Sequence, residues 1–232
     1  MLKYPAQQQS IEQHTSMSKV SIRTPDIVIG RLPIYLRVLE HIASNGTRVT
    51  SSQEMGEHLG ISPAQIRKDL SHFGEFGKQG TGYDVVYLRK QLQRILGLQQ
   101  DWDVALIGAG AVGKAIMRYA GFRGRGFHIA AVFDNDDSKI GRKINNLKIL
   151  HVNVLKSTIH QMGIRMAMIT VPSEQAQKVA DMLVEASVEA VLNYAPVNLI
   201  VPPEVHVQHI DPVVGLQHMT YYLSSYSTLT QG

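Results

Sequence analysis

The sequence of 232 residues contains no cysteine. This absence excludes disulfide bonds, cysteine-ligated zinc, thiolate nucleophiles and Cys-x-x-Cys redox chemistry. The sequence also lacks an apolar run of the roughly 18–20 residues that a membrane helix needs, and its first residues lack the apolar segment of a signal peptide. The ten histidines show no metal-site spacing such as His-x-x-x-His. These absences predict a soluble, cytoplasmic protein without a membrane partner or a metal ion.

Excess charge is confined to the first part of the chain. Residues 1–97 carry 12 lysines and arginines against 8 acidic residues, whereas residues 98–232 carry 11 of each. A chain of this length accommodates one or two domains. The basic part predicts a polyanionic partner such as nucleic acid, although an excess of four charges is also ordinary for a module of this size.

Helix start and stop signals in residues 27–73 predict a helix-turn-helix. A first helix is expected over residues 27–43, with Pro33 breaking or kinking its first part. Ser51 and Ser62 each precede a Glu or Gln by three residues, which is the capping-box pattern. Gly60 then separates two short helices, as in a tight helix-turn-helix connection.

The second of these short helices, over residues 63–73, is the expected recognition helix. In the major groove Arg and Lys recognise guanine edges and Gln recognises adenine, while short hydroxyl groups suit phosphate. The segment 76–85 has two β-like stretches around a glycine-rich tip with a lysine, which is typical of a wing. A solvated helix face would produce the same residue types on the helix. The residues predicted to contact DNA are Ser62, Gln65, Arg67, Lys68, Ser71 and Lys78.

From Trp102 onward, short apolar runs alternate with helical segments, which predicts a parallel doubly wound sheet. The expected strands are residues 103–107, 128–133, 148–150, 165–171, 188–192 and 205–210. A helix is expected from about residue 114, a second over residues 174–186, and a last one over about 213–225. The last helix lies beyond the sheet, so its apolar surface requires a partner.

A glycine-rich loop follows the first of these strands and opens a helix, which is the context of a dinucleotide-binding fingerprint. Its residues are Gly108, Ala109, Gly110, Ala111, Val112 and Gly113. Gly108 permits the tight turn, Gly110 lets a pyrophosphate approach the backbone, and Gly113 permits close packing of helix and strand. Asp134 ends the second strand, where a carboxylate binds the adenosine ribose; a strand-end turn residue is the alternative. The acidic residues after Asp134 disfavour a 2′-phosphate, so the predicted cofactor is NAD(H).

No motif supplies the acid–base group that hydride transfer usually needs, and no second large domain is available for a substrate. The sequence therefore predicts a protein that is not an enzyme. One alternative is a small NAD-dependent oxidoreductase with an N-terminal dimerisation domain. Another is a CoA- or nucleotide-binding module that does not bind DNA, which Asp134 disfavours.

Several short segments of the sequence, taken together, are specific enough to indicate a known protein family. They are residues 31–37 (RLPIYLR), 65–74 (QIRKDLSHFG), 77–83 (GKQGTGY), 108–113 (GAGAVG), 133–134 (FD), 170–172 (TVP), 192–196 (LNYAP) and 209–211 (HID). These segments closely resemble the Rex family, which are bacterial redox-sensing transcriptional repressors. The resemblance covers roughly residues 25–225.

The resemblance implies a homodimer in which each C-terminal helix is swapped onto its partner. It further implies that double-stranded operator DNA is bound with NAD+ or without cofactor and is released by NADH. At the cofactor cleft it places Thr170, Val171, Pro172, Asn193, Tyr194 and Ala195. Tyr119 and Asp211 match positions near the nicotinamide and the domain interface, and Asp211 is a candidate switch residue that pairs with Arg37 or Tyr119. Pro212 departs from the larger apolar residue that is frequent in the family.

The fold class expected from these observations is α/β. An N-terminal winged helix-turn-helix precedes a C-terminal Rossmann doubly wound parallel sheet and a domain-swapped C-terminal helix. The expected segments are a disordered arm (1–25), a winged-helix domain (26–97), a Rossmann NAD(H)-binding domain (98–211), and a dimerisation helix with a tail (212–232).

Overall fold

The computed structural model describes residues 24–77 and 80–229, with side chains described up to residue 224. The chain forms two compact units, Met1–Leu96 and Gly97–Gly232. The predicted break after residue 97 lies one residue from this division. Apart from its last two residues, the predicted arm over residues 1–25 lies outside the described residues.

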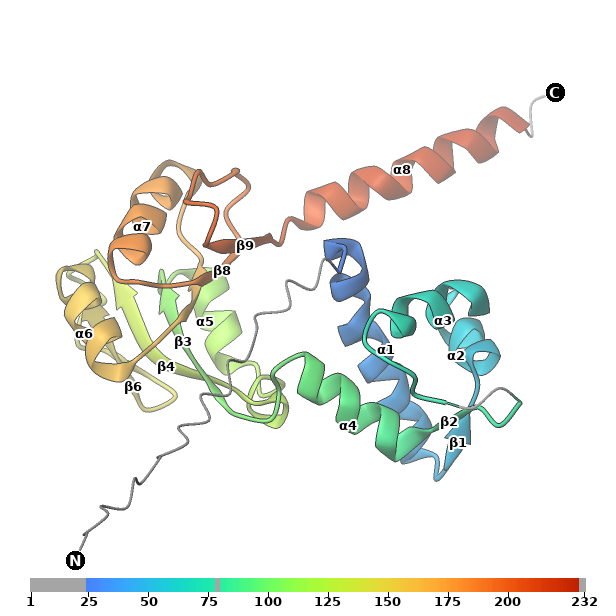
Figure 1. The fold of residues 1–232 in the computed structure, drawn as a ribbon. Coiled ribbons are helices and arrows are strands. Elements are labelled where there is room, and N and C mark those ends of the chain that lie inside the picture. Colours follow the sequence, from blue (N-terminus) through green and yellow to red (C-terminus); the bar gives the residue numbers. More distant parts are fainter. Residues whose placement is uncertain (1–23, 78–79, 230–232) are drawn as a thin grey trace, which may run out of the picture. The chain divides into compact units, whose positions relative to one another are not determined.

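The first unit is a small helical domain with one two-stranded sheet (Figure 1). Its elements are α1 (Asp26–Ser44), β1 (Val49–Thr50), α2 (Ser52–Leu59), α3 (Pro63–Ser71), β2 (Tyr83–Asp84) and α4 (Val85–Ile95). Leu32, Leu39 and Ile42 of α1 are buried, and so are Ile66 of α3 and Leu88 of α4. Because each helix buries one apolar face, α3, the expected recognition helix, is held in the unit with its other face exposed.

Pro33 does not break α1, which runs without interruption from Asp26 to Ser44. A proline inside a helix removes one backbone hydrogen bond and costs about 3 kcal/mol. Pro33 is exposed, whereas Leu32, Tyr35 and Leu36 are buried. The burial of these neighbours offsets the missing hydrogen bond, so the predicted break is wrong.

Only half of each predicted capping box forms. Ser51 and Ser62 are the N-caps of α2 and α3, and each hydroxyl accepts the backbone N–H three residues on, from Glu54 (3.1 Å) and Gln65 (3.2 Å). The reciprocal bonds are replaced because both longer side chains have other partners. Glu54 accepts the Thr50 hydroxyl at 2.7 Å, and Gln65 donates to an aspartate of its own helix. Helix α3 also ends at Ser71, two residues before the predicted end.

Among its described residues the predicted wing segment, 76–85, contributes strand β2. This strand pairs antiparallel with β1, which precedes α2, with Val49 opposite Asp84. Gly82 has a φ of +78°, and a Cβ there would lie 2.4 Å from the Thr50 carbonyl oxygen. This close approach requires glycine and draws the segment toward β1. Residues 78–79, at the predicted wing tip, lie outside the described residues.

The second unit is a Rossmann-type α/β domain, as predicted. Its helices are α5 (Ala111–Arg118), η1 (Arg123–Arg125), η2 (Val152–Val154), α6 (Leu155–Met162), α7 (Ser173–Glu185) and α8 (Pro212–Leu229). Its strands are β3 (Trp102–Ile107), β4 (Phe127–Asp134), β5 (Lys143–Ile144), β6 (Leu147–His151), β7 (Met166–Ile169), β8 (Ala190–Asn193) and β9 (His206–His209). The strand order is β5-β6-β4-β3-β7-β8-β9, and all neighbours are parallel except β5 and β6.

The hairpin β5–β6 and helix α6 were not predicted. Strand β5 has only two residues, too few for an alternating pattern. Asn145 and Asn146 form its turn with φ values of 48° and 68°, a conformation that asparagine tolerates better than most residues. Helix α5 also begins at Ala111, before the predicted start.

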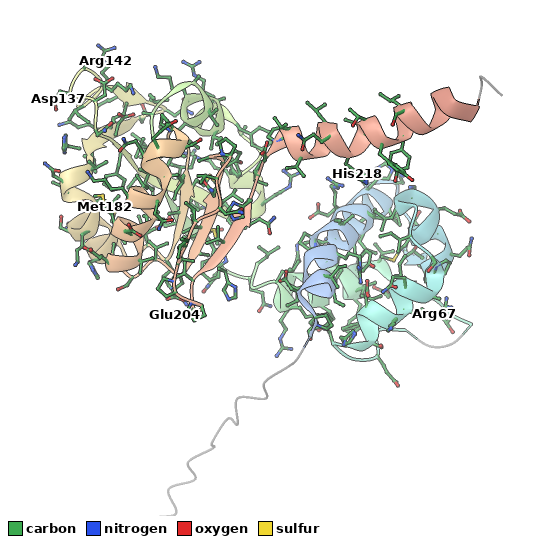
Figure 2. The ribbon with its side chains drawn as sticks, turned by 90° about the horizontal axis from the view of Figure 1, so that it is seen from above. Arg67, Asp137, Arg142, Met182, Glu204 and His218 are labelled. Carbon is green, nitrogen blue, oxygen red and sulfur yellow. The ribbon has the colours of Figure 1, made fainter. Side chains whose placement is uncertain are left out.

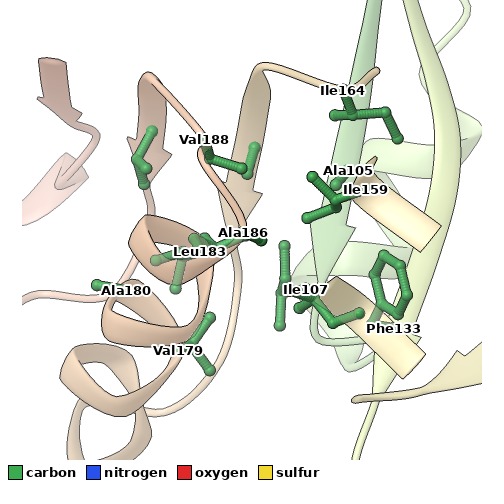
Figure 3. Close-up of a cluster of buried hydrophobic side chains, with 14 of the residues drawn as sticks. Ala105, Ile107, Phe133, Ile159, Ile164, Val179, Ala180, Leu183, Ala186 and Val188 are labelled. Carbon is green, nitrogen blue, oxygen red and sulfur yellow. The ribbon is translucent and has the colours of Figure 1, made fainter. Parts of the chain in front are cut away.

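Helices cover both faces of the sheet (Figure 1). On β3, Ala105 and Ile107 belong to the apolar cluster that includes α6 and α7, whereas Val104 and Leu106 pack with α5. Figure 3 shows the first cluster, where Ile107 and Phe133 of the strands lie in one core with Leu183 of α7. Alternation along a doubly buried strand produces these two layers.

Helix α8 has an unusual surface for an exposed helix. It contains no Asp, Glu, Lys or Arg. Its apolar side chains are between 51% and 69% exposed, namely Val213, Val214, Leu216, Met219, Tyr221, Tyr222 and Leu223. An exposed surface with this much apolar area and no charge is normally covered by another molecule or segment. Among the described residues, no helix is long and apolar enough to cross a membrane.

Candidate nucleic-acid interface and dinucleotide cavity

The loop between β3 and α5 needs glycine at two positions and leaves space at a third. A Cβ on Gly108, whose φ is +104°, would lie 2.7 Å from the Thr170 carbonyl oxygen, and one on Gly113 would lie 2.0 Å from the Gly108 oxygen. At Gly110, in contrast, an added Cβ would meet no atom within 4 Å. The loop is therefore packed tightly against its neighbours at Gly108 and Gly113 and is open at Gly110, next to the positive end of the α5 dipole.

The carboxylate of Asp134 is held by the backbone of two loops. One oxygen accepts the Ala109 N–H at 2.7 Å, the other accepts the Asp136 N–H at 2.9 Å, and the Lys139 ammonium lies 3.1 Å away. Burial alone would raise the pKa of Asp134, but these hydrogen bonds and the Lys139 charge outweigh burial and lower it. Asp134 is therefore ionised, and it fixes the glycine loop beside it.

A cavity of about 450 Å³ lies beside this loop, where the strand order reverses between β3 and β7. Ligands of open α/β sheets bind at such a switch point, at the carboxyl ends of the strands. Six predicted residues line the cavity: Gly108, Gly110, Asp134, Thr170, Val171 and Pro172. Lys139 and Lys178 line it as well, and the prediction missed both. Lys139 follows Asp134 closely, but nothing in the sequence relates Lys178 of α7 to the loop.

The other residues of the glycine loop have supporting positions. Ala109 and Gly113 are buried, and Ala111 and Val112 are exposed in the first turn of α5. Besides lining the cavity, Thr170 donates its hydroxyl to the carbonyl oxygens of Ile107 (3.0 Å) and Gly108 (2.7 Å). This hydroxyl thus ties the end of β7 to the glycine loop.

Asn193, Tyr194 and Ala195 do not line the cavity. The side chain of the fully buried Asn193 accepts the Ala195 N–H at 2.9 Å and donates to the Val197 carbonyl oxygen at 2.9 Å. Ala195 packs in the core, and burial raises the pKa of Tyr194. The structure therefore assigns these residues to the shape of the turn after β8.

Tyr119 and Asp211 are also away from the cavity. Tyr119 is 57% exposed, stacks edge-to-face on Phe122 with ring centres 5.1 Å apart, and lines a separate cavity of about 390 Å³. Asp211 accepts the Val213 N–H at 2.9 Å, at the start of α8. The described residues contain no hydrogen bond between Tyr119 and Asp211.

Four of the six predicted DNA-binding residues are exposed on α3 or at its N-terminus, and Figure 2 labels one of them, Arg67. Arg67, Lys68 and Ser71 are exposed, and the Arg67 guanidinium donates to the Ser52 hydroxyl at 2.9 Å. Ser62 is exposed at the helix N-terminus and Ser71 donates to the Lys68 carbonyl oxygen. Lys78 lies outside the described residues. Two cations on one exposed helix face suit a DNA backbone or groove.

Gln65 has a different environment, because it contacts Asp69, a fully buried residue that the sequence did not single out. Asp69 accepts hydrogen bonds from Arg31 (2.5 and 2.7 Å), from the Tyr35 hydroxyl (2.5 Å) and from the Gln65 amide (2.7 Å). Burial alone would raise the pKa of Asp69, but the bonds from Arg31, Tyr35 and Gln65 outweigh it and lower the pKa. Gln65 and Asp69 are four residues apart on one helix, and so are Arg31 and Tyr35. This spacing was the available signal in the sequence that each pair shares one helix face.

Among the described residues, no group of three or more His, Asp and Glu is placed to hold a metal ion.

Comparisons with known proteins agree with this division into two units. Residues 23–71 match a family model described as a putative DNA-binding protein N-terminus, and residues 99–197 match one described as a CoA binding domain. The second description belongs to the nucleotide-binding class that the sequence left open.

Relatives over most of the chain are more specific. The redox-sensing transcriptional repressor Rex of Chloroflexus aurantiacus is 54% identical over 200 residues, covering 86% of this chain and 94% of that protein. The Rex of Desulfitobacterium hafniense is 44% identical, covering 87% and 96%. The structure of RSP in complex with β-NAD+ and operator DNA has a TM-score of 0.83 and 35% identity, covering 89% and 95%. RSP in complex with β-NADH has a TM-score of 0.81 and 33% identity, covering 88% of this chain and 96% of RSP.

A winged-helix unit joined to a Rossmann unit with a dinucleotide cavity defines a class of protein, the DNA-binding regulators built on a nucleotide-binding domain. Within this class the coverage and identity are sufficient to name the family. The chain belongs to the Rex family of redox-sensing transcriptional repressors, as the sequence motifs predicted.

Proposed function

We propose that this chain is a transcriptional repressor that senses the NADH/NAD+ ratio. It binds operator DNA as a homodimer with NAD+ or without cofactor, and it releases the DNA when NADH binds. The observation that carries this proposal is one chain with exposed cations on a helix-turn-helix and a glycine-lined cavity at a switch point. The RSP complexes with β-NAD+ and operator DNA and with β-NADH support it. The protein acts in the cytoplasm and is not an enzyme.

The residues around the cavity fit a bound dinucleotide. The open space at Gly110 admits a pyrophosphate to the loop from Gly108 to Gly113, next to the α5 N-terminus. Asp134 lines the cavity with a charged carboxylate, the group that binds ribose hydroxyls at this position; it already accepts two backbone N–H groups and the Lys139 ammonium, which lies 3.3 and 3.1 Å from its two oxygens. NAD(H), when bound, carries the redox signal, which a chain without cysteine cannot detect through thiols of its own.

On the DNA side, Arg67 and Lys68 bind base edges or phosphates, and Ser62 and Ser71 bind phosphates. Lys78 contacts the DNA from the wing. The remaining predicted cofactor residues act by shape, since Thr170 ties β7 to the loop and Asn193 builds the turn after β8.

A second copy of the chain covers the apolar surface of α8 in this proposal. The exposed apolar side chains of this uncharged helix are the reason, because water does not solvate such a surface favourably. A homodimer also presents two α3 helices to two half-sites. Gel filtration with light scattering tests this part: a monomer at micromolar concentration would contradict it.

NADH must bind the released form more tightly than the DNA-bound form, because equal binding to both forms shifts nothing. NAD+ carries a charged planar ring and NADH a neutral puckered one, so the difference lies at the nicotinamide. Asp211 is the switch residue, pairing with Arg37 in the DNA-binding form and with Tyr119 in the NADH form. In a gel shift, Asp211→Ala should weaken release by NADH; release unchanged from the wild type would refute this role.

One experiment tests the whole proposal. Duplexes bound by the full chain are selected from a random pool, and their gel shifts are compared with NADH, NAD+ or no cofactor. We expect the protein–DNA complex to be lost when NADH is added and to be retained with NAD+ or without cofactor. Retention of the complex under all three conditions would contradict redox sensing, and NADH turnover on a hydroxy acid or an aldehyde would identify an oxidoreductase instead.

A further inference from the structure

We propose that Asp69 fixes the side-chain amide of Gln65 in one orientation and so makes Gln65 a reader of adenine at one base pair of each operator half-site. This inference rests on the proposed DNA binding by α3. It concerns a residue, Asp69, that does not touch DNA and acts by positioning another.

The carboxylate of Asp69 is saturated by donors from two helices. Arg31 and Tyr35 come from α1 and supply three hydrogen bonds, while Gln65 of α3 supplies the fourth. An ionised carboxyl group has about four lone-pair sites and donates nothing. All four sites are therefore occupied, and the hydrogen bond from Gln65 forms together with the three from Arg31 and Tyr35.

This saturation determines which way the Gln65 amide faces. A carboxylate repels the amide oxygen and attracts the amide N–H, so Nε2 must face Asp69, as the distance of 2.7 Å records. A flip of the amide would place two oxygens in contact inside a site where Asp69 is fully buried. The pair is also local, because residues four apart on a helix share one face.

The orientation leaves one usable edge. The Nε2 group carries two hydrogens, and one of them is bonded to Asp69. In the proposed arrangement Asp69 accepts the hydrogen trans to Oε1, so the other hydrogen and the Oε1 acceptor remain side by side. In the major groove adenine presents the N7 acceptor beside the N6 donor, which is the complement of that edge. A free glutamine must lose rotamer freedom to make this contact, whereas Gln65 is already ordered.

The place of Gln65 on the helix is consistent with base contact. It is the third residue of α3 and is partly exposed, and it precedes the exposed Arg67 and Lys68 on the same helix. Residues near the N-terminus of a recognition helix are those that reach base edges. The network from α1 thus ends at a side chain that borders the exposed surface of α3.

The first test compares Gln65→Met with a matched control. The duplexes that the full-length wild-type protein selects from a random pool define its base preferences, and each variant is then put through the same selection. Gln65→Met should reduce the preference for adenine at one position per half-site on the order of 10- to 100-fold and leave the other positions unchanged. The control is Gln53→Met on α2, because Gln53 also donates to an acid four residues on, Glu57, but in an exposed pair. It should leave all positions unchanged.

The second test separates positioning from a structural role of Asp69. Asp69→Asn should lower the adenine preference at the position that Gln65→Met identifies, whereas a structural role would weaken binding to every duplex equally. If Asp69→Asn does not fold, Gln65→Glu decides, because the Asp69 carboxylate repels a carboxylate at residue 65. If Asp69 sets the orientation of residue 65, the adenine preference should be lost without a change to cytosine. A change to cytosine, whose N4 donates to a carboxylate, would show that residue 65 reads the base independently of Asp69 and would overturn the positioning role.

Unchanged base preferences in Gln65→Met, or an equal loss at all positions, would overturn the inference. That failure is distinct from failure of the proposed function, in which the wild-type chain selects no duplex or does not release its duplex with NADH.

Discussion

Asp69 in the first unit and Asp134 in the second are both buried and both ionised, but different groups stabilise their charges. The donors to Asp69 are side chains, two of them from a helix more than thirty residues away in sequence. The donors to Asp134 are two backbone N–H groups and the Lys139 ammonium, all from adjacent loops. One carboxylate therefore joins two helices, whereas the other shapes a binding loop.

Because of this difference, substitutions can remove the hydrogen-bond donors of Asp69 more easily than those of Asp134. Side-chain donors disappear with a single mutation, but backbone donors remain whatever residue other than proline stands at position 109 or 136. The environment of Asp134 is thus robust, and that of Asp69 depends on the identity of three side chains. The predictions below test this contrast, from the largest expected effect to the smallest.

Removal of the two carboxylates should have unequal effects on stability. Asp69→Ala leaves the Arg31 guanidinium and the Tyr35 hydroxyl without their partner, and breaking a buried ion pair costs about 3–5 kcal/mol. Asp134→Ala leaves two backbone N–H groups beside a cavity that water can enter, so a cost of about 1–3 kcal/mol is expected. Urea unfolding followed by circular dichroism measures both. Equal costs would show that the origin of the donors is irrelevant.

Two glycines of the cofactor loop should separate folding from binding. Gly113→Ala places a Cβ 2.0 Å from the Gly108 oxygen, so the loop must move; we expect a loss of about 1–3 kcal/mol of stability together with loss of NADH binding. Gly110→Ala meets no protein atom within 4 Å. It should unfold like the wild type but bind NADH at least about tenfold more weakly, because the Cβ blocks the pyrophosphate. NADH fluorescence titration and thermal unfolding give the two readouts. Wild-type affinity in Gly110→Ala would place the pyrophosphate elsewhere.

Both carboxylates should make the protein sensitive to acid. The pKa values of Asp69 and Asp134 are lowered in the folded chain, so each contributes stability that is complete above the ordinary aspartate pKa of about 3.9 and is lost as the pH falls through the folded-state value. The difference in unfolding free energy between wild type and Asp69→Asn should therefore be smaller at pH 3 than at pH 6. Urea midpoints at the two pH values test this, and a constant difference would argue against an ionised Asp69.

The smallest effect concerns Arg67. If its guanidinium binds a phosphate, Arg67→Ala should reduce the slope of log affinity against log salt by about 0.9. If it reads a base, the slope stays and discrimination at one base pair falls. The control is Arg165→Ala. Arg165 directly precedes β7 in the second unit and is paired with Glu189, so its loss should change neither the salt dependence nor the base discrimination. Arg67→Ala with both properties unchanged would contradict the assignment of α3.

Local patterns in the sequence predicted the parts of the molecule that local physics determines. The glycine loop, the strand before it and Asp134 lie within one short stretch, and the structure brings them together at one cavity. The N-caps Ser51 and Ser62 likewise depend on residues three positions away.

The failures involve pairings between distant segments. Strand β2 pairs with β1 across α2 and α3, and Asp69 is matched by Arg31 across 38 positions. The resemblance places Asn193 at the cofactor cleft, but no pattern in the sequence indicated that its amide also bonds the turn after β8. Single-sequence patterns contain no information on which distant partner will occupy a hydrogen-bonding group.

The Asp69 network also has an evolutionary consequence if Gln65 reads a base as proposed. Arg31, Tyr35 and Gln65 share the Asp69 carboxylate, so a substitution of Gln65 would change the base preference, whereas a substitution of Arg31, Tyr35 or Asp69 would first destabilise the domain. Under the proposal, a new base preference would arise by one substitution only where the new side chain at residue 65 is compatible with the other three residues.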